Sequence, residues 1–198
     1  MILEILDDLL TIIKTENDTK NAFLSVIKLG ENKINSKIWK GFYLMDIEND
    51  RNDAKDWLHN TIISYPKMNG IYLGLDTLNM DSGNGSNVEI GLTEKCNPAI
   101  LNNDWIFECE FYGESHLIKG LSDVEKYFTN ENKWTYKERS FAEFLIFIGY
   151  SGIVFKEALS SLNLKNDFLS VWGFHDGDVF YLMQKFKEEK SLIAATCN

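Results

Sequence analysis

The sequence predicts an α+β fold, a single domain in which a mainly antiparallel sheet packs against helices. The chain has 198 residues, enough for one domain that buries about two-thirds of its unfolded surface. Helical and strand patterns occur in blocks and do not alternate regularly, which argues against a doubly wound parallel sheet. No repeat or linker divides the chain. We therefore predict one domain over residues 1–198, with residues 1–66 as a candidate helical subregion.

The N-terminal block is predicted to be mostly helical. Apolar residues at helical spacing predict one helix over residues 2–14 and a second that Asp18 or Thr19 caps and Gly30 ends. A short helix is also expected over residues 54–63. Before it, the aromatic side chains in "KIWKGFYLMDIE" favour a first strand.

The middle of the chain shows strand patterns. Residues 70–78 and 87–94 predict two strands around a polar loop. The stretch "DWIFECEFYG", residues 104–113, alternates apolar and acidic side chains, which predicts a strand with one buried face and one acidic face. "SHLIKG" is expected to pair with it through a turn at Gly113. The predicted buried face holds Trp105, Phe107, Cys109 and Phe111, and the acidic face holds Glu108 and Glu110.

Helical patterns return after residue 120. In "LSDVEKYF", Ser122 and Glu125 have the spacing of a capping box. Residues 138–150 and 152–164 are both predicted to be helical, and Ser151 between them is interpreted as a cap or helix break.

The last two predicted strands, residues 167–174 and 178–186, flank the sequence "HDGD". Its Asp-Gly dipeptide is a strong hairpin signal. His175, Asp176 and Asp178 could instead bind a metal, but no further ligands are evident, and we favour the turn. We predict no cofactor and no metal site here.

Composition limits the class of partner. The net charge is −10, and arginine occurs only at Arg51 and Arg139; such a surface repels phosphate backbones, so no nucleic-acid partner is expected. The longest apolar run, residues 144–155, is shorter than the roughly 18 residues of a membrane span. No membrane partner is expected. The odd number of cysteines and the lack of a basic leader favour a cytoplasmic protein with reduced thiols.

The loop in "LDTLNMDSGNGSNVEIGL" was compared with three kinds of site. No register matches an EF-hand calcium loop. A strand pattern follows the glycines where a phosphate-binding loop would open a helix. A hairpin tip is the favoured interpretation, although a different calcium site using Asp76, Asp81 and Asn84 stays open.

An acidic strand face in "DWIFECEFYGES", an amide-rich "DSGNGSNVE" and the lack of an enzyme signature together resemble the immunity proteins of bacterial polymorphic-toxin systems. The resemblance implies a cytoplasmic, non-catalytic protein that neutralises a cognate toxin by direct binding. The partner would be a basic toxin domain. The predicted contact residues are Asp81, Asn84, Asn87, Glu89, Glu108, Glu110, Glu114 and Trp134.

Two alternatives stay open. The first is a carboxylate- or metal-dependent hydrolase that uses Glu108 and Glu110, or His175, Asp176 and Asp178. The second is a regulatory interaction module without a toxin partner.

Overall fold

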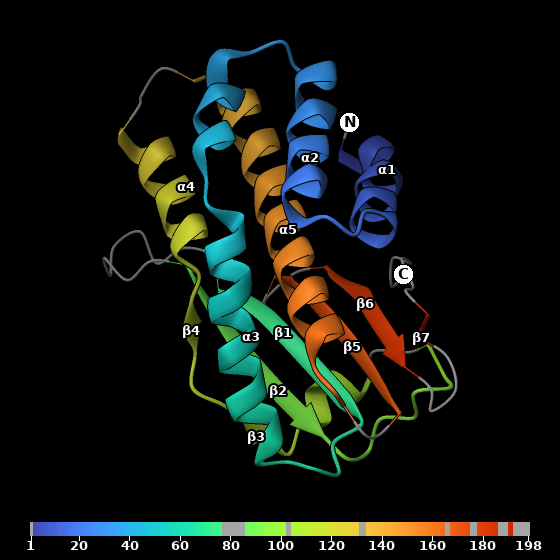
Figure 1. The fold of residues 1–198 in the computed structure, drawn as a ribbon. Coiled ribbons are helices and arrows are strands. Elements are labelled where there is room, and N and C mark those ends of the chain that lie inside the picture. The colour runs from blue at the N-terminus through green and yellow to red at the C-terminus, as the bar shows by residue number, and fades with distance from the viewer. Residues whose placement is uncertain are drawn as a thin grey trace.

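The computed structural model describes residues 2–76, 86–101, 104–130, 134–164, 167–174, 178–185 and 190–191. The described strands form one mixed sheet, in the order β3-β2-β1-β5-β6-β7 with β4 also beside β2 (Figure 1). Strands β1 and β5 are parallel, and the other described pairs are antiparallel. The predicted α+β class, with a mainly antiparallel sheet, is confirmed.

The elements have the following bounds. The helices are α1 Ile2–Thr15, α2 Thr19–Lys33, η1 Lys37–Leu44, α3 Ile47–Ile63, η2 Asp104–Glu108, α4 Lys119–Asn130 and α5 Tyr136–Ser161, where η denotes a 3₁₀ helix. The strands are β1 Gly70–Asp76, β2 Asn87–Thr93, β3 Phe111–Tyr112, β4 His116–Leu117, β5 Phe168–Phe174, β6 Val179–Lys185 and β7 Lys190–Ser191.

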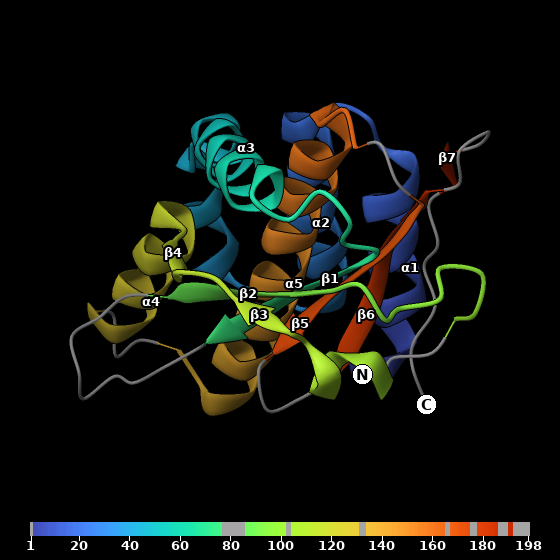
Figure 2. The ribbon, with the colours of Figure 1, turned by 90° about the horizontal axis from the view of Figure 1, so that it is seen from below.

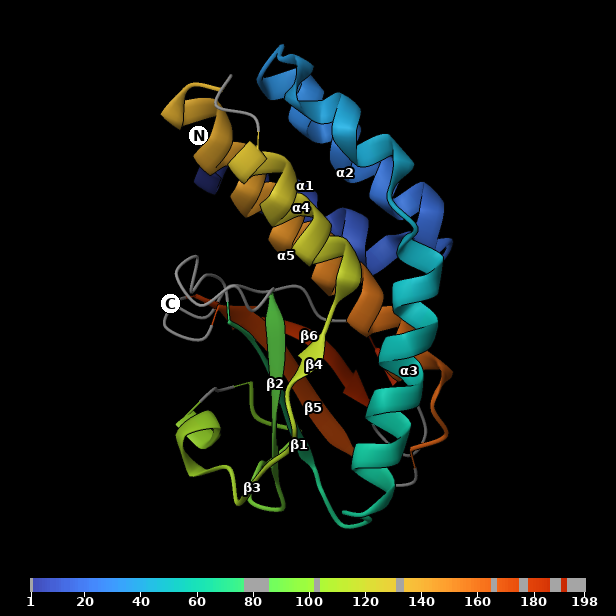
Figure 3. The same ribbon diagram turned by 90° about the vertical axis from the view of Figure 1, so that its left-hand side faces the viewer.

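The two faces of the sheet are covered differently. Alternate β1 residues Ile71, Leu73 and Leu75 point into the main core, where the α-helices pack. On the other face, Tyr72 belongs to a smaller cluster with Trp105 of η2. Figure 3 shows the helices on one side of the sheet and lime-green η2 on the other. Figure 2 shows α3 and α4 near the β4 edge, and α1 near the β6–β7 edge.

The first helices begin where the sequence predicts. Asp18 caps α2, and its Oδ1 accepts the backbone N–H of Asn21 at 2.7 Å. Helix α2 continues past the predicted stop at Gly30 to Lys33. Helix α3 is longer than expected because Asp46 caps it and it begins at Ile47, seven residues before the predicted start at Ala54. The polar side chains of that first part hide its helical pattern.

The predicted first strand, residues 37–48, is wrong. Residues Lys37–Leu44 form η1, and the Trp39 indole N–H donates to the Ile34 carbonyl at 2.7 Å. The Trp39 ring is fully buried against Gly30, where an added Cβ would collide with it. Strand propensity mostly reflects how a side chain packs, and here the aromatic residues pack against helices.

Helix α5 runs unbroken through Ser151, so the predicted cap or break there is wrong. The Ser151 hydroxyl donates to the Phe147 carbonyl at 2.5 Å within the helix. Gly149 and Gly152 let neighbours approach closely, because a Cβ there would meet Val26 and Trp172 respectively. These glycines serve packing at the centre of the fold.

Helix α5 is also long and apolar enough to cross a membrane by length and composition. In its most apolar window, however, 78% of residues are buried inside the protein. A core helix meets the same criteria, and α5 packs against α2 and α3.

Two predictions around α4 are corrected. The helix begins at Lys119, so Ser122 lies inside the first turns and its hydroxyl donates to the Ile118 carbonyl at 3.3 Å. Strand β4 pairs with β2, with His116 opposite Val88, rather than with the residues before Gly113.

At the C-terminal side, the antiparallel β5–β6 pair confirms the two predicted strands. Their connection at His175 and Asp176 lies outside the described residues.

Candidate partner-binding surface

Residues 86–118, here called the acidic segment, run from β2 through η2, β3 and β4. They contain six acidic residues and one lysine, and so carry half of the chain's net charge of −10. The sequence predicted one strand with two faces over residues 104–113, and this is wrong in its first half. Residues Asp104–Glu108 form η2, and only Phe111 and Tyr112 pair as β3.

The 3₁₀ turn changes which side chains are buried. Trp105 is 5% exposed and packs on the sheet, whereas Phe107 is 89% exposed. A strand would put both side chains on one face, but three residues per turn separate them. Glu108 follows Phe107 and is also exposed. The exposed Phe107 ring and the exposed Glu108 carboxylate are thus neighbours on a turn that the buried Trp105 side chain attaches to the sheet.

Glu110 has internal partners. Its carboxylate lies 3.3 Å from the Lys95 ammonium and accepts the backbone N–H of Glu94 at 3.1 Å. That hydrogen bond, and secondly Lys95, lower the pKa of Glu110. The two contacts fix the end of β2 against the chain before β3. Glu110 therefore shapes this surface as well as contributing charge to it.

Tyr112 joins β2 to η2. Its hydroxyl donates to the Ile106 carbonyl at 3.4 Å. Burial, and then neighbouring Cys109 and Glu89, raise the pKa of Tyr112, which places Glu89 on the same surface. Of the predicted contacts, Glu89 lies near Tyr112 and Glu110 lies near Cys109, whereas Glu108 ends η2. The three carboxylates therefore do not share one strand face.

The surroundings of Cys96 and Cys109 keep both thiols protonated at neutral pH. Burial is the main cause that raises the pKa of Cys96 to about 12 and that of Cys109 to about 11. Because the thiolate is the nucleophile, these thiols are poorly suited to covalent catalysis at neutral pH.

Two other predicted contact residues of the acidic segment lie nearer to β4 and α3. Asn87 begins β2, opposite Asp76 and Leu117, and Glu114 is exposed near α3, with its carbonyl accepting the Trp57 indole N–H at 3.3 Å. The other residues, Asp81 and Asn84, lie outside the described residues.

Trp134, another predicted contact residue, precedes α5. This side chain is half-buried against the main core, with its ring centroid 6.1 Å from that of Tyr127. Its ring is therefore only partly accessible to another molecule.

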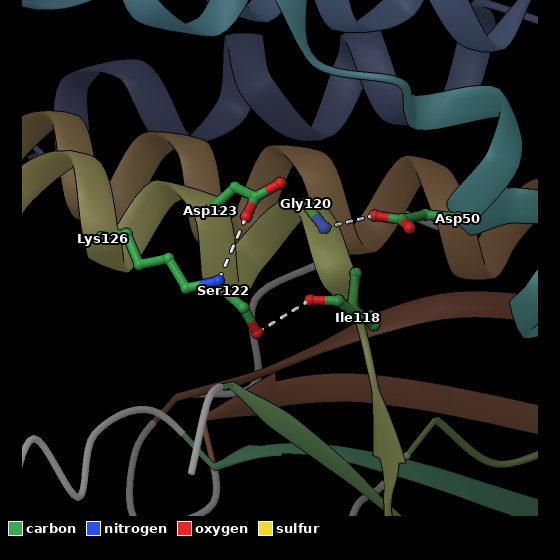
Figure 4. Close-up of polar contacts among 6 residues, drawn as sticks. All are labelled: Asp50, Ile118, Gly120, Ser122, Asp123 and Lys126. Carbon is green, nitrogen blue, oxygen red and sulfur yellow. Dashed lines mark hydrogen bonds and ion pairs between the residues drawn. The ribbon is translucent and has the colours of Figure 1, made fainter. Parts of the chain in front are cut away.

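A second group of polar residues lies inside the fold, where α3 meets α4 and α5. The Asp50 carboxylate Oδ2 accepts the Gly120 N–H at 2.7 Å (Figure 4) and the Tyr150 hydroxyl at 2.7 Å. Burial raises the pKa of Asp50, against the opposing effect of these two hydrogen bonds. Asp50 thereby caps the first turn of α4 from another helix. We call these three residues the buried junction.

Gly120 is required at this junction. A Cβ there would collide with the Tyr150 hydroxyl and the Asp50 carboxylate. Outside the junction, Asp123 pairs with Lys126 at 3.5 Å on the exposed side of α4 (Figure 4). All three residues of the junction are buried, so it links α3, α4 and α5 inside the fold.

An apolar cavity of about 300 Å³ lies where α3 and α5 end. Its lining includes Ile62, Met68 and Leu162, with His59 and Asn163 at more polar positions. In the part of the chain that the structure describes, no group of three His, Cys, Asp or Glu side chains is placed to hold a metal ion.

Comparison with protein-family models, curated proteins and solved structures finds no significant match. The sequence did not predict the exposure of Phe107, because the alternation of residues 104–113 fits a strand and gives no sign of a 3₁₀ turn. The acids at Asp104 and Glu108, three and one residues from Phe107, were the available signal for an exposed turn.

Proposed function

We propose that this protein is a non-catalytic binding protein that neutralises a cognate toxin by direct contact, as immunity proteins of bacterial polymorphic-toxin systems do. It would act in the cytoplasm and bind a basic face of the toxin. The observation that carries the proposal is the set of exposed carboxylates on the acidic segment, at Glu94, Asp104, Glu108 and Glu110.

Electrostatics supports this kind of contact. A surface with six acids and one lysine attracts a basic partner over distances set by the ionic strength. Where such charges become desolvated and well paired, truncating one costs about 2–5 kcal/mol of binding free energy. The Glu110 contacts to Lys95 and Glu94 hold part of this charge in place before binding, which reduces the entropy lost on association.

The test uses the purified protein encoded beside this gene in its native genome. We expect a tight complex by isothermal titration calorimetry, with an association rate that falls as salt rises. The triple variant Glu94→Gln, Asp104→Asn and Glu108→Gln should weaken binding about tenfold or more.

A matched control changes three exposed acids on the other face of the sheet: Asp7→Asn, Asp8→Asn and Glu48→Gln on α1 and α3. It alters the net charge equally but leaves the acidic segment intact. Equal weakening by both triple variants would mean that only net charge matters. No binding by the wild-type chain would exclude the neighbouring protein as its target and contradict the proposed toxin neutralisation.

A further inference from the structure

Exposed apolar side chains are frequent in the acidic segment. Among the described residues, nine large hydrophobic side chains are exposed, and four of them lie within residues 100–112. Single exposed hydrophobic residues are ordinary, whereas a group of them with a polar border is typical of interaction sites. The four are Ile100 at 53%, Leu101 at 45%, Phe107 at 89% and Tyr112 at 55% exposed.

The backbone beneath Phe107 is held firmly. Trp105 packs against Gly70 of β1, and the Tyr112 hydroxyl reaches the carbonyl of Ile106, the residue before Phe107. On the preceding turn, the Gln184 side-chain amide donates to the Pro98 carbonyl. A large aromatic side chain on a fixed backbone loses little conformational entropy when it binds.

We infer that Phe107 of η2, with Tyr112 of the following strand β3, is the apolar anchor of the partner contact. It inserts into a hydrophobic socket on a basic protein domain, and lysines or arginines around the socket face the carboxylates that border the ring. The inference rests on the proposed function and specifies its binding residue and the chemistry of its partner surface. Aromatic anchors surrounded by polar contacts dominate many interfaces.

The charge around Phe107 indicates whether its partner is a second copy of this chain or a basic protein. The exposed acids next to the ring are Asp104 and Glu108, and Glu94 and Glu110 lie near Lys95 at the end of β2. A second copy of the chain would bring the same acids face to face, which is unfavourable. A basic surface with an apolar socket satisfies both the ring and the carboxylates.

The first test measures binding of Phe107→Ala to the purified neighbouring gene product. We expect the dissociation constant to rise about thirtyfold or more, as for a hot-spot aromatic residue. The control is Tyr136→Ala, an aromatic side chain that is 87% exposed at the start of α5, on the far side of the molecule from η2 (Figure 3). It should leave binding unchanged. Wild-type binding that Phe107→Ala does not alter would overturn the inference while leaving the proposed function intact.

A second probe tests the anchor if the neighbouring protein does not bind. A synthetic-antibody library is selected on the full wild-type chain, and each binder is re-tested on both variants. We expect most binders to be rich in lysine or arginine, to lose binding to Phe107→Ala and to keep binding to Tyr136→Ala. Binders indifferent to Phe107→Ala would overturn the inference. The inference would also be overturned if the wild type were a dimer in gel filtration and Phe107→Ala were a monomer. In that case the ring would contact a second copy of the chain and not a basic partner.

Discussion

Asp50 and Glu108 are both helix carboxylates, yet their surroundings differ completely. Asp50 is 5% exposed and accepts two hydrogen bonds from partners far away in the sequence. Glu108 is exposed beside Phe107, an aromatic ring that the fold leaves in water. The buried junction directs its polar groups inward, and the acidic segment directs them outward.

The difference separates residues that stabilise the fold from residues available to another molecule. A buried carboxylate that accepts hydrogen bonds from several helices stabilises one arrangement of those helices. Removing it leaves buried donors without an acceptor, which lowers the stability of the fold. An exposed carboxylate adds little to folding but keeps its full charge for a partner. Mutations in the two regions should therefore affect different measurements.

The largest stability effect is expected for Asp50→Ala. The change leaves the Gly120 N–H and the Tyr150 hydroxyl buried without an acceptor, and we expect a loss of about 2 kcal/mol or more in the free energy of unfolding. Urea denaturation measures it. The control is Asp56→Ala on the exposed side of the same helix, which should change little. Equal effects of the two variants would show that the junction does not stabilise the packing of α3 on α4.

The second prediction concerns pH. Burial raises the pKa of Asp50, so the folded protein holds this proton more tightly than the unfolded chain does. The resulting stabilisation is full below the unfolded pKa of about 4 and is lost as pH rises through the folded value. Asp50→Asn removes this titration. The stability of the wild type relative to Asp50→Asn should therefore fall as pH rises from about 4, close to the unfolded pKa of aspartate.

Urea denaturation of both proteins across that pH range provides the measurement. Subtracting one curve from the other cancels the titration of groups that the substitution does not touch. A difference that stays constant with pH would contradict the raised pKa of Asp50.

The smallest stability effect is expected for Phe107→Ala. Its ring is 89% exposed, so removing it should change the free energy of unfolding by less than about 0.5 kcal/mol. Thermal and urea unfolding would check this before the binding assays. A loss above about 1 kcal/mol, the size expected from buried side chains, would show that the ring packs within the protein and is not a free anchor.

Much of the fold could be predicted from local patterns. Strong periodicity identified α1, β1, β2, β5 and β6, and Asp18 marked the start of α2. The errors occurred where side-chain type suggested one conformation and long-range packing required another. Trp39 has a side chain that favours strands, but it lies in a 3₁₀ helix. Its ring is buried there against Gly30 of the preceding helix.

The candidate surface was predicted only in part. Glu108 and Glu110 were expected on one strand face, whereas the structure places Glu108 at the end of η2 and pairs Glu110 with Lys95. Alternating residues fit a strand locally, whereas in the fold Trp105 is buried on the far face of the sheet and Phe107 of the same 3₁₀ turn is exposed.

By itself, the sequence determined the fold class and the concentration of negative charge in residues 86–118, because hydrophobic period and charge are local properties. Tertiary structure decided which carboxylates are internal and which face water. Asp50 meets Gly120 and Tyr150 only because α3, α4 and α5 pack together. Phe107 is exposed because Trp105 occupies the apolar space on the sheet, and such competition for burial depends on residues distant in the sequence.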